Sequence, residues 1–143
     1  MSQPPPTFDL LDKVLGIRDR AARLESYADR IRDAQAAARV ASDQVREAKD
    51  ELARAEADVR HLALIELQAA AGPKARTNKE QREAAVTKRL SEDPEVLQCR
   101  EALRQRERDS DAAWDEVRRQ ENGFAGARAA ADLISGSLRA IAR

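Results

Sequence analysis

Six basic side chains gather between residues 73 and 91, and their charge is the main chemical signal in this sequence. This stretch holds 6 Lys and Arg against 2 Asp and Glu, whereas residues 1–72 hold 11 against 13 and residues 92–143 hold 9 against 11. The six residues are Lys74, Arg76, Lys79, Arg82, Lys88 and Arg89. Grouped ammonium and guanidinium groups bind phosphates, although a charged loop is more often simply solvated. If several copies of the chain present this cluster together, we expect it to bind a polyanion avidly.

Residues suited to catalysis are scarce. The chain has one histidine, His61, and no nucleophile-elbow, phosphate-binding loop, zinc-ligand spacing or glycine-rich dinucleotide motif. Carboxylates such as Glu47 and Glu51 alternate with Arg and Lys, which is typical of a solvated helix surface. The single cysteine, Cys99, cannot form a disulfide within one chain and is interpreted as a small buried hydrophobe. We therefore expect no enzymatic activity, no metal site and no cofactor.

The aromatic side chains do not form a stacking platform. Only 3% of residues are aromatic; Tyr27 lies in the first heptad seam and Trp114 next to the seam residue Ala113, and we expect both to be packing residues because aromatic side chains bury large areas. Proteins that bind single strands usually add stacked aromatic rings to a basic track. Binding to a nucleic acid would therefore be directed to the backbone, insensitive to sequence and weakened by salt.

Two heptad runs must position these residues. Side chains at alternating spacings of three and four predict long helices that supercoil with a seam facing a partner helix. The first seam comprises Leu24, Tyr27, Ile31, Ala34, Ala38, Ala41, Val45, Ala48, Leu52, Ala55, Val59 and Leu62. The second comprises Val96, Cys99, Leu103, Arg106, Ser110, Ala113, Val117, Gln120, Phe124, Ala127, Ala131, Ile134, Leu138 and Ile141. The predicted fold is all-α, a long helical hairpin with coiled-coil-type packing and a short N-terminal helix, which associates into an oligomeric helical assembly.

Breaks in the pattern set the expected boundaries. Gly72 and Pro73 end the first long helix, Thr77 with Glu80 predicts a capping box, and Asp93 is the expected cap before Pro94. Close backbone approach is expected near Gly123 and Gly126. We predict a flexible Pro-rich leader at 1–6 and one helical-hairpin domain at 7–143. Within it we expect a short helix at 7–17, a long helix at 19–71, a loop at 72–78, a short helix at 79–91 and a long helix at 94–142.

Self-association is expected because the seams are rich in alanine and bury little area. From Gly123 onward only four residues are charged, so this segment is the predicted oligomer core of an assembly larger than a dimer. Its large apolar anchors are Phe124, Ile134, Leu138 and Ile141. Neither a membrane span nor a signal peptide is apparent, so we expect a cytoplasmic protein without membrane contact, in the host cytoplasm if a phage encodes it.

The order of elements resembles the UvsY family of phage recombination mediators. The matching residues are Ser91, Asp93, Glu95, Val96 and Leu97 after the charged Lys88 and Arg89, and then Gly123, Phe124 and Ala125. The resemblance extends from about Leu24 to Ile134. It departs from the family where the first long helix ends, because residues 63–68 lack the basic and aromatic side chains found there in UvsY.

The resemblance implies a homo-oligomeric ring of helical hairpins that binds single-stranded DNA. It also implies that the protein helps a RecA-like recombinase to displace single-strand-binding protein and form a filament. Given the departure, the DNA contact is predicted to shift to the six basic residues of 73–91. The alternative is a structural coiled-coil scaffold, adaptor or assembly chaperone whose partners are only proteins, with the basic cluster serving as solvated surface.

Overall fold

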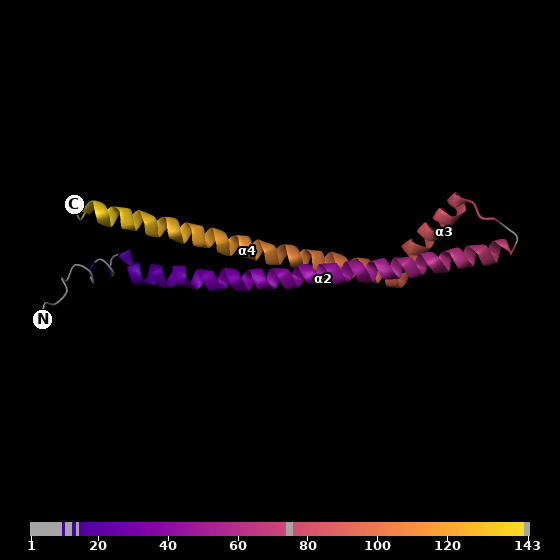
Figure 1. The fold of residues 1–143 in the computed structure, drawn as a ribbon, viewed down its shortest axis with the longest axis horizontal. Coiled ribbons are helices and arrows are strands. Elements are labelled where there is room, and N and C mark those ends of the chain that lie inside the picture. The colour runs from indigo at the N-terminus through magenta and orange to yellow at the C-terminus, as the bar shows by residue number, and fades with distance from the viewer. Residues whose placement is uncertain (1–9, 11–12, 14, 74–75, 142–143) are drawn as a thin grey trace. The chain divides into compact units, whose positions relative to one another are not determined.

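The computed structural model describes residues 10, 13, 15–73 and 76–141, apart from the side chain of residue 141. Across these residues the chain forms three helices, α2 (Ile17–Ala71), α3 (Lys79–Glu92) and α4 (Pro94–Ile141), and no strand (Figure 1). The all-α prediction is therefore confirmed. Within the same residues, no helix combines the length and the apolar character needed to cross a bilayer. The expected leader at 1–6 and most of the expected helix at 7–17 lie outside the described residues.

Glycine bounds α2 at both ends. Gly16 precedes it with φ of 59°, and the helix begins at Ile17, two residues before the predicted start. Gly72 follows its last residue with φ of 89°, and the Gly72 N–H donates to the Gln68 carbonyl at 3.1 Å. These left-handed backbone angles suit glycine because it has no Cβ. The second break ends α2 at Ala71, as the sequence predicts.

The cap of α3 differs from the predicted one by a single residue. Asn78, rather than Thr77, is the N-cap, and its Oδ1 accepts from the Gln81 N–H at 2.8 Å. The Gln81 side chain accepts in turn from the Asn78 N–H at 3.1 Å, which completes a capping box. Asparagine is a stronger N-cap than threonine, and it places a glutamine at the reciprocating position. The pairing of Thr77 with Glu80 was therefore the wrong register.

The start of α4 confirms the predicted cap. Asp93 Oδ1 accepts from the backbone N–H groups of Glu95 and Val96 at 3.0 and 3.2 Å. Pro94 occupies the first helical position, where a missing N–H costs no hydrogen bond. Asp93 itself is extended, with φ of −71° and ψ of 122°, so the chain changes direction between α3 and α4.

The chain divides into two compact units. Unit 1 comprises Met1–Ala38 and Ala112–Arg143, and unit 2 comprises residues 39–111. In unit 1, α2 and α4 run antiparallel, because Tyr27 contacts Phe124 while Gln35, further along α2, reaches back to Glu121 at 3.4 Å. Ala38 and Val117 are buried in this unit.

An aromatic contact fixes the register in unit 1. The Tyr27 and Phe124 ring centroids are 6.1 Å apart in an edge-to-face arrangement, and the Arg30 guanidinium lies 4.8 Å from the Tyr27 centroid. A Cβ placed on Gly123 would lie only 3.0 Å from Tyr27 Cε1 and Oη. Gly123 thus makes the predicted close approach. The expectation was wrong for Gly126, where an added Cβ would meet nothing within 4 Å.

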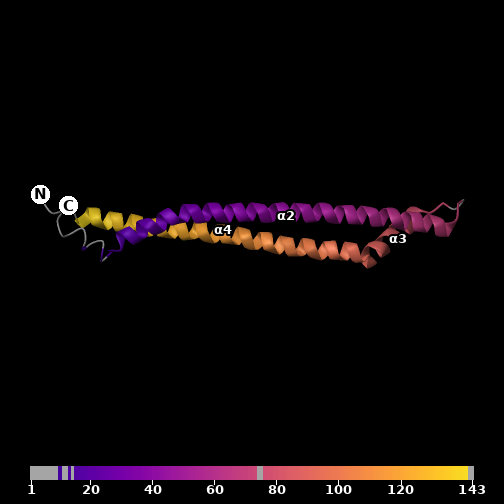
Figure 2. The ribbon, with the colours of Figure 1, turned by 90° about the horizontal axis from the view of Figure 1, so that it is seen from below.

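Unit 2 has a small core of Ala55, Val59 and Val96, against which Leu52, Leu90 and Cys99 pack. Polar contacts between α2 and α4 flank it. Arg100 binds Glu56 at 2.9 Å, Arg106 donates to Gln44 at 3.1 Å, and the hydroxyls of Ser42 and Ser110 lie 3.4 Å apart. In these contacts, later residues of α2 meet earlier residues of α4, so the two helices are antiparallel in this unit as well. Figure 2 shows their unit 2 segments side by side.

Most predicted seam positions are the less exposed positions of α2 and α4. Arg106 is exposed, and the first seam fails at its end, where Leu62 is 49% exposed and Ala63 is only 4% exposed. The buried positions Ala55, Val59 and Ala63 follow a spacing of four rather than alternating four and three. The reason is that a different helix lies beside this part of α2, because Ala63 and Leu67 line a groove together with residues of α3.

Candidate nucleic-acid interface

The structure does not gather the five described residues of the predicted basic cluster into one patch. Lys74 lies outside the described residues, and Arg76 is exposed just before the cap of α3. The remaining four residues belong to α3, which packs beside the last turns of α2 (Figure 1). They divide between two grooves, one on each side of α3.

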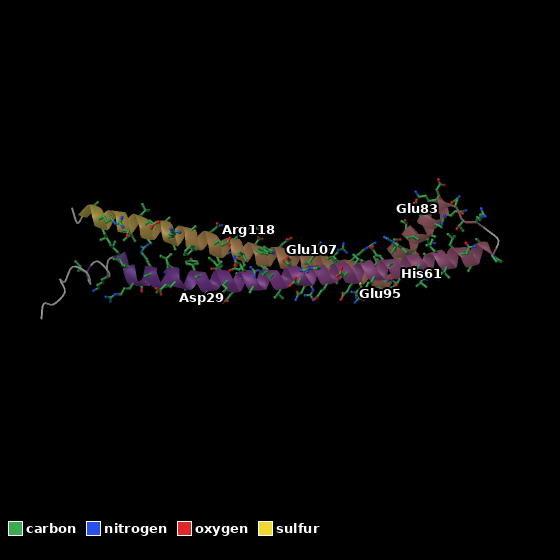
Figure 3. The ribbon with its side chains drawn as sticks, in the orientation of Figure 1. Asp29, His61, Glu83, Glu95, Glu107 and Arg118 are labelled. Carbon is green, nitrogen blue, oxygen red and sulfur yellow. The ribbon has the colours of Figure 1, made fainter. Side chains whose placement is uncertain are left out.

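The first groove, which we call the cationic groove, receives three basic side chains and one acidic one. Its lining comprises Arg60 and Leu64 of α2 with Lys79, Arg82, Glu83, Val86, Thr87 and Leu90 of α3. Counting Arg60, Lys79 and Arg82 against Glu83 gives a formal charge of 3 − 1, or +2. Figure 3 labels Glu83 on α3 and His61, the residue that follows Arg60 on α2.

The second groove, which we call the neutral groove, balances its charges. Its lining comprises Ala63, Glu66 and Leu67 of α2 with Ala85, Lys88, Arg89 and Glu92 of α3. Two basic and two acidic side chains give a formal charge of 2 − 2, or zero. The Arg89 guanidinium also reaches across to Glu66 at 3.5 Å, which ties α3 to α2.

Helical spacing explains the division. Lys79, Arg82, Val86 and Leu90 follow each other at intervals of three or four, so they share a side of α3. Ala85, Lys88 and Glu92 form another such row, whose centre is about a third of a turn away, and Arg89 lies between the two rows because it follows Arg82 by seven residues. A cluster that is continuous in sequence is therefore separated in space, because the helix distributes it around its axis.

Ion pairs leave different amounts of free charge in the two grooves. Lys79 Nζ lies 3.6 Å from Glu83 Oε1 in an exposed pair within α3, and the Arg60 guanidinium lies 3.7 Å from Glu56, whose side chain is only 23% exposed and also binds Arg100. An exposed pair such as Lys79 with Glu83 contributes little and exchanges readily for another anion. Among the described residues, Arg76, Arg82 and Lys88 have no ion-pair partner. Of the three described cations in the cationic groove, Arg82 is thus the one without an ion-pair partner.

Sequence reasoning missed Arg60. It lies one turn before the stretch 63–68, whose lack of basic residues was noted, and it is separated by 19 residues from Lys79 in the sequence. Only the packing of α3 on α2 brings Arg60 to the same groove as Lys79 and Arg82. The one available signal is its position in the last part of the first long helix, which a short loop connects to the next helix, so the two helices are expected to pack together.

Among the described aromatic residues, Tyr27 and Phe124 pack against each other, whereas Trp114, predicted to be a packing residue, is 40% exposed. The Tyr27 ring contacts Phe124 and lies where a Cβ on residue 123 would meet it, so the ring serves packing. Neither groove beside α3 is lined by an aromatic side chain. In the part of the chain that is described, no three His, Cys, Asp or Glu side chains are grouped to hold a metal ion.

Three of the four predicted oligomer anchors face their own chain within unit 1. Phe124 contacts Tyr27, while Ile134 and Leu138 border an apolar groove together with Ile17 and Leu24 of α2. The side chain of Ile141 lies outside the described residues. The role of these four residues in an oligomer stays a prediction.

In comparisons with protein families, curated proteins and solved structures, no match to this chain was found.

Proposed function

We propose that this protein binds single-stranded DNA as a non-enzymatic homo-oligomer and assists the loading of a RecA-like recombinase. The cationic groove carries the proposal, because it brings Arg60, Lys79 and Arg82 together from two helices. Arg76 lies just outside α3 and adds a further exposed cation near Lys79 in the sequence. Backbone phosphates supply the matching charge, and each neutralised phosphate releases counterions.

The preference for a single strand rests on the resemblance to UvsY. The groove between α2 and α3 places its cations along a shallow surface, on which the phosphates of an extended strand can lie. Leu64, Val86 and Leu90 provide apolar surface in the same groove, which suits contact with deoxyribose. Without an aromatic lining, the groove offers no base stacking, and we expect little sequence preference.

Recombination mediation is the finer part of the proposal, and it rests on the resemblance to UvsY. A mediator of this type contacts single-stranded DNA, a RecA-like recombinase and single-strand-binding protein. The test is filament assembly by a RecA-like recombinase on DNA already coated with single-strand-binding protein. We expect the added protein to shorten the lag before assembly, and an unchanged lag would remove the mediator role while leaving DNA binding to its own test.

A structural scaffold with protein partners remains the second candidate. The exposed Leu62 and Ile65, at 49% and 51%, favour it because they lie three residues apart on α2 and present apolar surface to solvent. In this case the cationic groove would be solvated surface. A protein that fails to bind any DNA at low salt would support this candidate.

The decisive experiment measures fluorescence anisotropy of a labelled oligothymidine at low salt. We expect the Arg60→Ala, Arg76→Ala, Lys79→Ala, Arg82→Ala variant to bind at least about a hundredfold more weakly, since four phosphate contacts are lost. The matched control is the Lys88→Ala, Arg89→Ala variant, which removes two cations from the neutral groove and should bind nearly as the parent does. Circular dichroism should show equal helicity in all three proteins. Equal affinities would overturn the assignment of DNA to the cationic groove.

A further inference from the structure

The start of α2 and the end of α4 lie at the same end of unit 1, and their seam is incompletely covered there (Figure 1). An apolar groove at this end is lined by Ile17, Arg20, Ala21, Leu24, Ala131, Ile134, Ser135 and Leu138. Its four large hydrophobic side chains are only half-buried. Among the described residues, none before Ala38 in α2 and none after Val117 in α4 is buried. The two helices therefore leave apolar surface here that a third element can cover.

The segment that precedes α2 ends at the rim of this groove. Gly16, with φ of 59°, separates Leu15 from Ile17, which lines the groove, and a left-handed glycine lets the chain change direction. Arg20, another lining residue, donates from Nε to the Leu15 carbonyl at 2.9 Å. A cationic donor on a late carbonyl also suits the C-terminal end of a helix. This bond ties the end of the preceding segment to the groove.

The preceding segment has one apolar face. At about 100° per residue, Phe8, Leu11 and Leu15 fall on one side of a helix, while Leu10 and Lys13 fall on the other. Leu10, Lys13 and Leu15 are described, and all three are helical. Leu10 is 65% exposed and Lys13 is exposed, whereas Leu15 is half-buried. Phe8 and Leu11 lie outside the described residues, but they share the side of Leu15 and not that of the two exposed residues.

We propose that residues 8–15 dock as an amphipathic helical segment in this groove of their own chain, with Phe8 and Leu11 inserted between α2 and α4. The lengths agree, because eight helical residues measure about 12 Å and the lining extends over residues 17–24 and 131–138, which are equally long stretches. The size also agrees. The groove has a volume of about 190 Å³, which exceeds the roughly 150 Å³ of engineered apolar cavities that accept benzene, so it has room for a phenylalanine ring.

The charges favour the same occupant. Residues 8–15 hold one Lys against two Asp, a net charge of −1, whereas residues 17–24 and 131–138 together hold three Arg against two Asp, a net charge of +1. Opposite net charges favour this association. In the proposed arrangement, Asp12 precedes Leu15 by one helical turn and comes near the Arg20 guanidinium that already binds the Leu15 carbonyl.

This contact goes beyond the proposed function, because the groove belongs to unit 1 and the cationic groove belongs to unit 2. It also gives Ile134 and Leu138, two of the predicted oligomer anchors, a contact within their own chain. Its test therefore has to distinguish a contact within one chain from a contact between chains.

Disulfide trapping makes that distinction. In a Cys99→Ala background, Leu11→Cys is combined with Ser135→Cys, and the dilute protein is oxidised with diamide. Cysteines pair where their Cα atoms come within about 7 Å, so we expect a disulfide within one chain to form at least about tenfold faster than in the matched variant with Leu10→Cys and Ser135→Cys. Mass under non-reducing conditions separates linked pairs of chains from single chains. Equal rates in the two variants, or disulfides mainly between chains, would overturn the proposal.

Hydrogen exchange tests the same contact without added cysteines. In the Phe8→Ala, Leu11→Ala variant, backbone amides of residues 20–24 and 131–138 should exchange at least about tenfold faster, because the lost cover lowers the cost of local opening. Leu10→Ala is the matched control and should leave their exchange unchanged. Oligothymidine affinity should be equal in these variants and the parent, which separates a failure of this contact from a failure of DNA binding. Unchanged exchange in the double variant, or equal acceleration in the control, would contradict the docking of residues 8–15.

Discussion

The two grooves beside α3 are built from the same pair of helices, but they offer an anion different surroundings. The cationic groove has a formal charge of +2 and contains Arg82, which has no ion-pair partner among the described residues. The neutral groove has a formal charge of zero, and its Arg89 is held by Glu66 across the helix interface at 3.5 Å. The comparison teaches that a local excess of positive charge in the sequence does not give equal charge to both sides of the helix that carries it, because neighbouring carboxylates balance one side.

The largest expected difference between the grooves appears in the salt dependence. The Arg60→Ala, Lys79→Ala, Arg82→Ala variant should reduce the slope of log affinity against log salt by about 2, at about 0.7 per lost phosphate contact on a single strand. The Lys88→Ala, Arg89→Ala variant should leave the slope within about 0.7 of the parent. Anisotropy titrations at several salt concentrations measure both slopes. Equal slopes would mean that the two grooves contribute alike.

A single charge reversal should sharpen the contrast. Arg82→Glu should weaken DNA binding by at least about tenfold at low salt, or about 1.4 kcal/mol, because it replaces the cation of the cationic groove that has no ion-pair partner among the described residues. Lys88→Glu makes the same reversal in the neutral groove. Lys88 also has no ion-pair partner among the described residues. A difference between the two variants therefore reports the groove in which the cation lies, and not whether the cation is ion-paired. An equal loss in both variants would contradict the assignment.

Neutralising the acidic residues of the neutral groove should make it resemble the cationic one. The Glu66→Gln, Glu92→Gln variant changes its formal charge from zero to +2 and releases Arg89 from its ion pair. We expect DNA affinity at low salt to rise by about threefold, since a second weak electrostatic site is added. The control is Glu101→Gln with Glu107→Gln, which removes the same charge from α4 away from both grooves. A matching rise in that control would assign the gain to overall charge.

The smallest expected effect concerns the cap that holds the first turn of α3. Asn78→Ala removes the side chain that accepts from Gln81 and should cost about 1 kcal/mol of helix stability. Fraying of this turn loosens Lys79 and Arg82 but leaves Lys88 and Arg89 ordered, so DNA affinity should fall by less than about threefold. Thermal unfolding followed by circular dichroism gives the stability. Thr77→Ala is the control, and a larger loss there would restore the predicted Thr77 capping box.

Local sequence signals predicted the elements well. The glycine at 72 and the Asp93–Pro94 pair mark helix ends through their own backbone chemistry, so α2 ends and α4 begins where the sequence indicates. The heptad spacing identified most of the less exposed positions of α2 and α4, because burial on one helix face repeats with the helix period. The cap of α3 was misplaced by one residue because Thr77 and Asn78 are adjacent and both can cap.

The residues of the candidate site were only half predictable. Lys79 and Arg82 were identified from composition, but composition did not separate them from Lys88 and Arg89, since all four share one short helix. Their separation depends on which side of α3 faces α2. Likewise, the sequence identified Phe124 as a large apolar anchor but did not show that it packs against Tyr27 of its own chain.

The sequence by itself determined the helical class, the helix ends and the presence of a basic segment, because these depend on residues close together along the chain. Only the tertiary structure decided that Arg60 joins Lys79 and Arg82, that Arg89 is paired with Glu66, and that Ala63 replaces Leu62 in the packed face. These outcomes depend on which helix packs beside the end of α2. Helix period alone cannot specify that partner, because α3 and α4 both present apolar residues at compatible spacings.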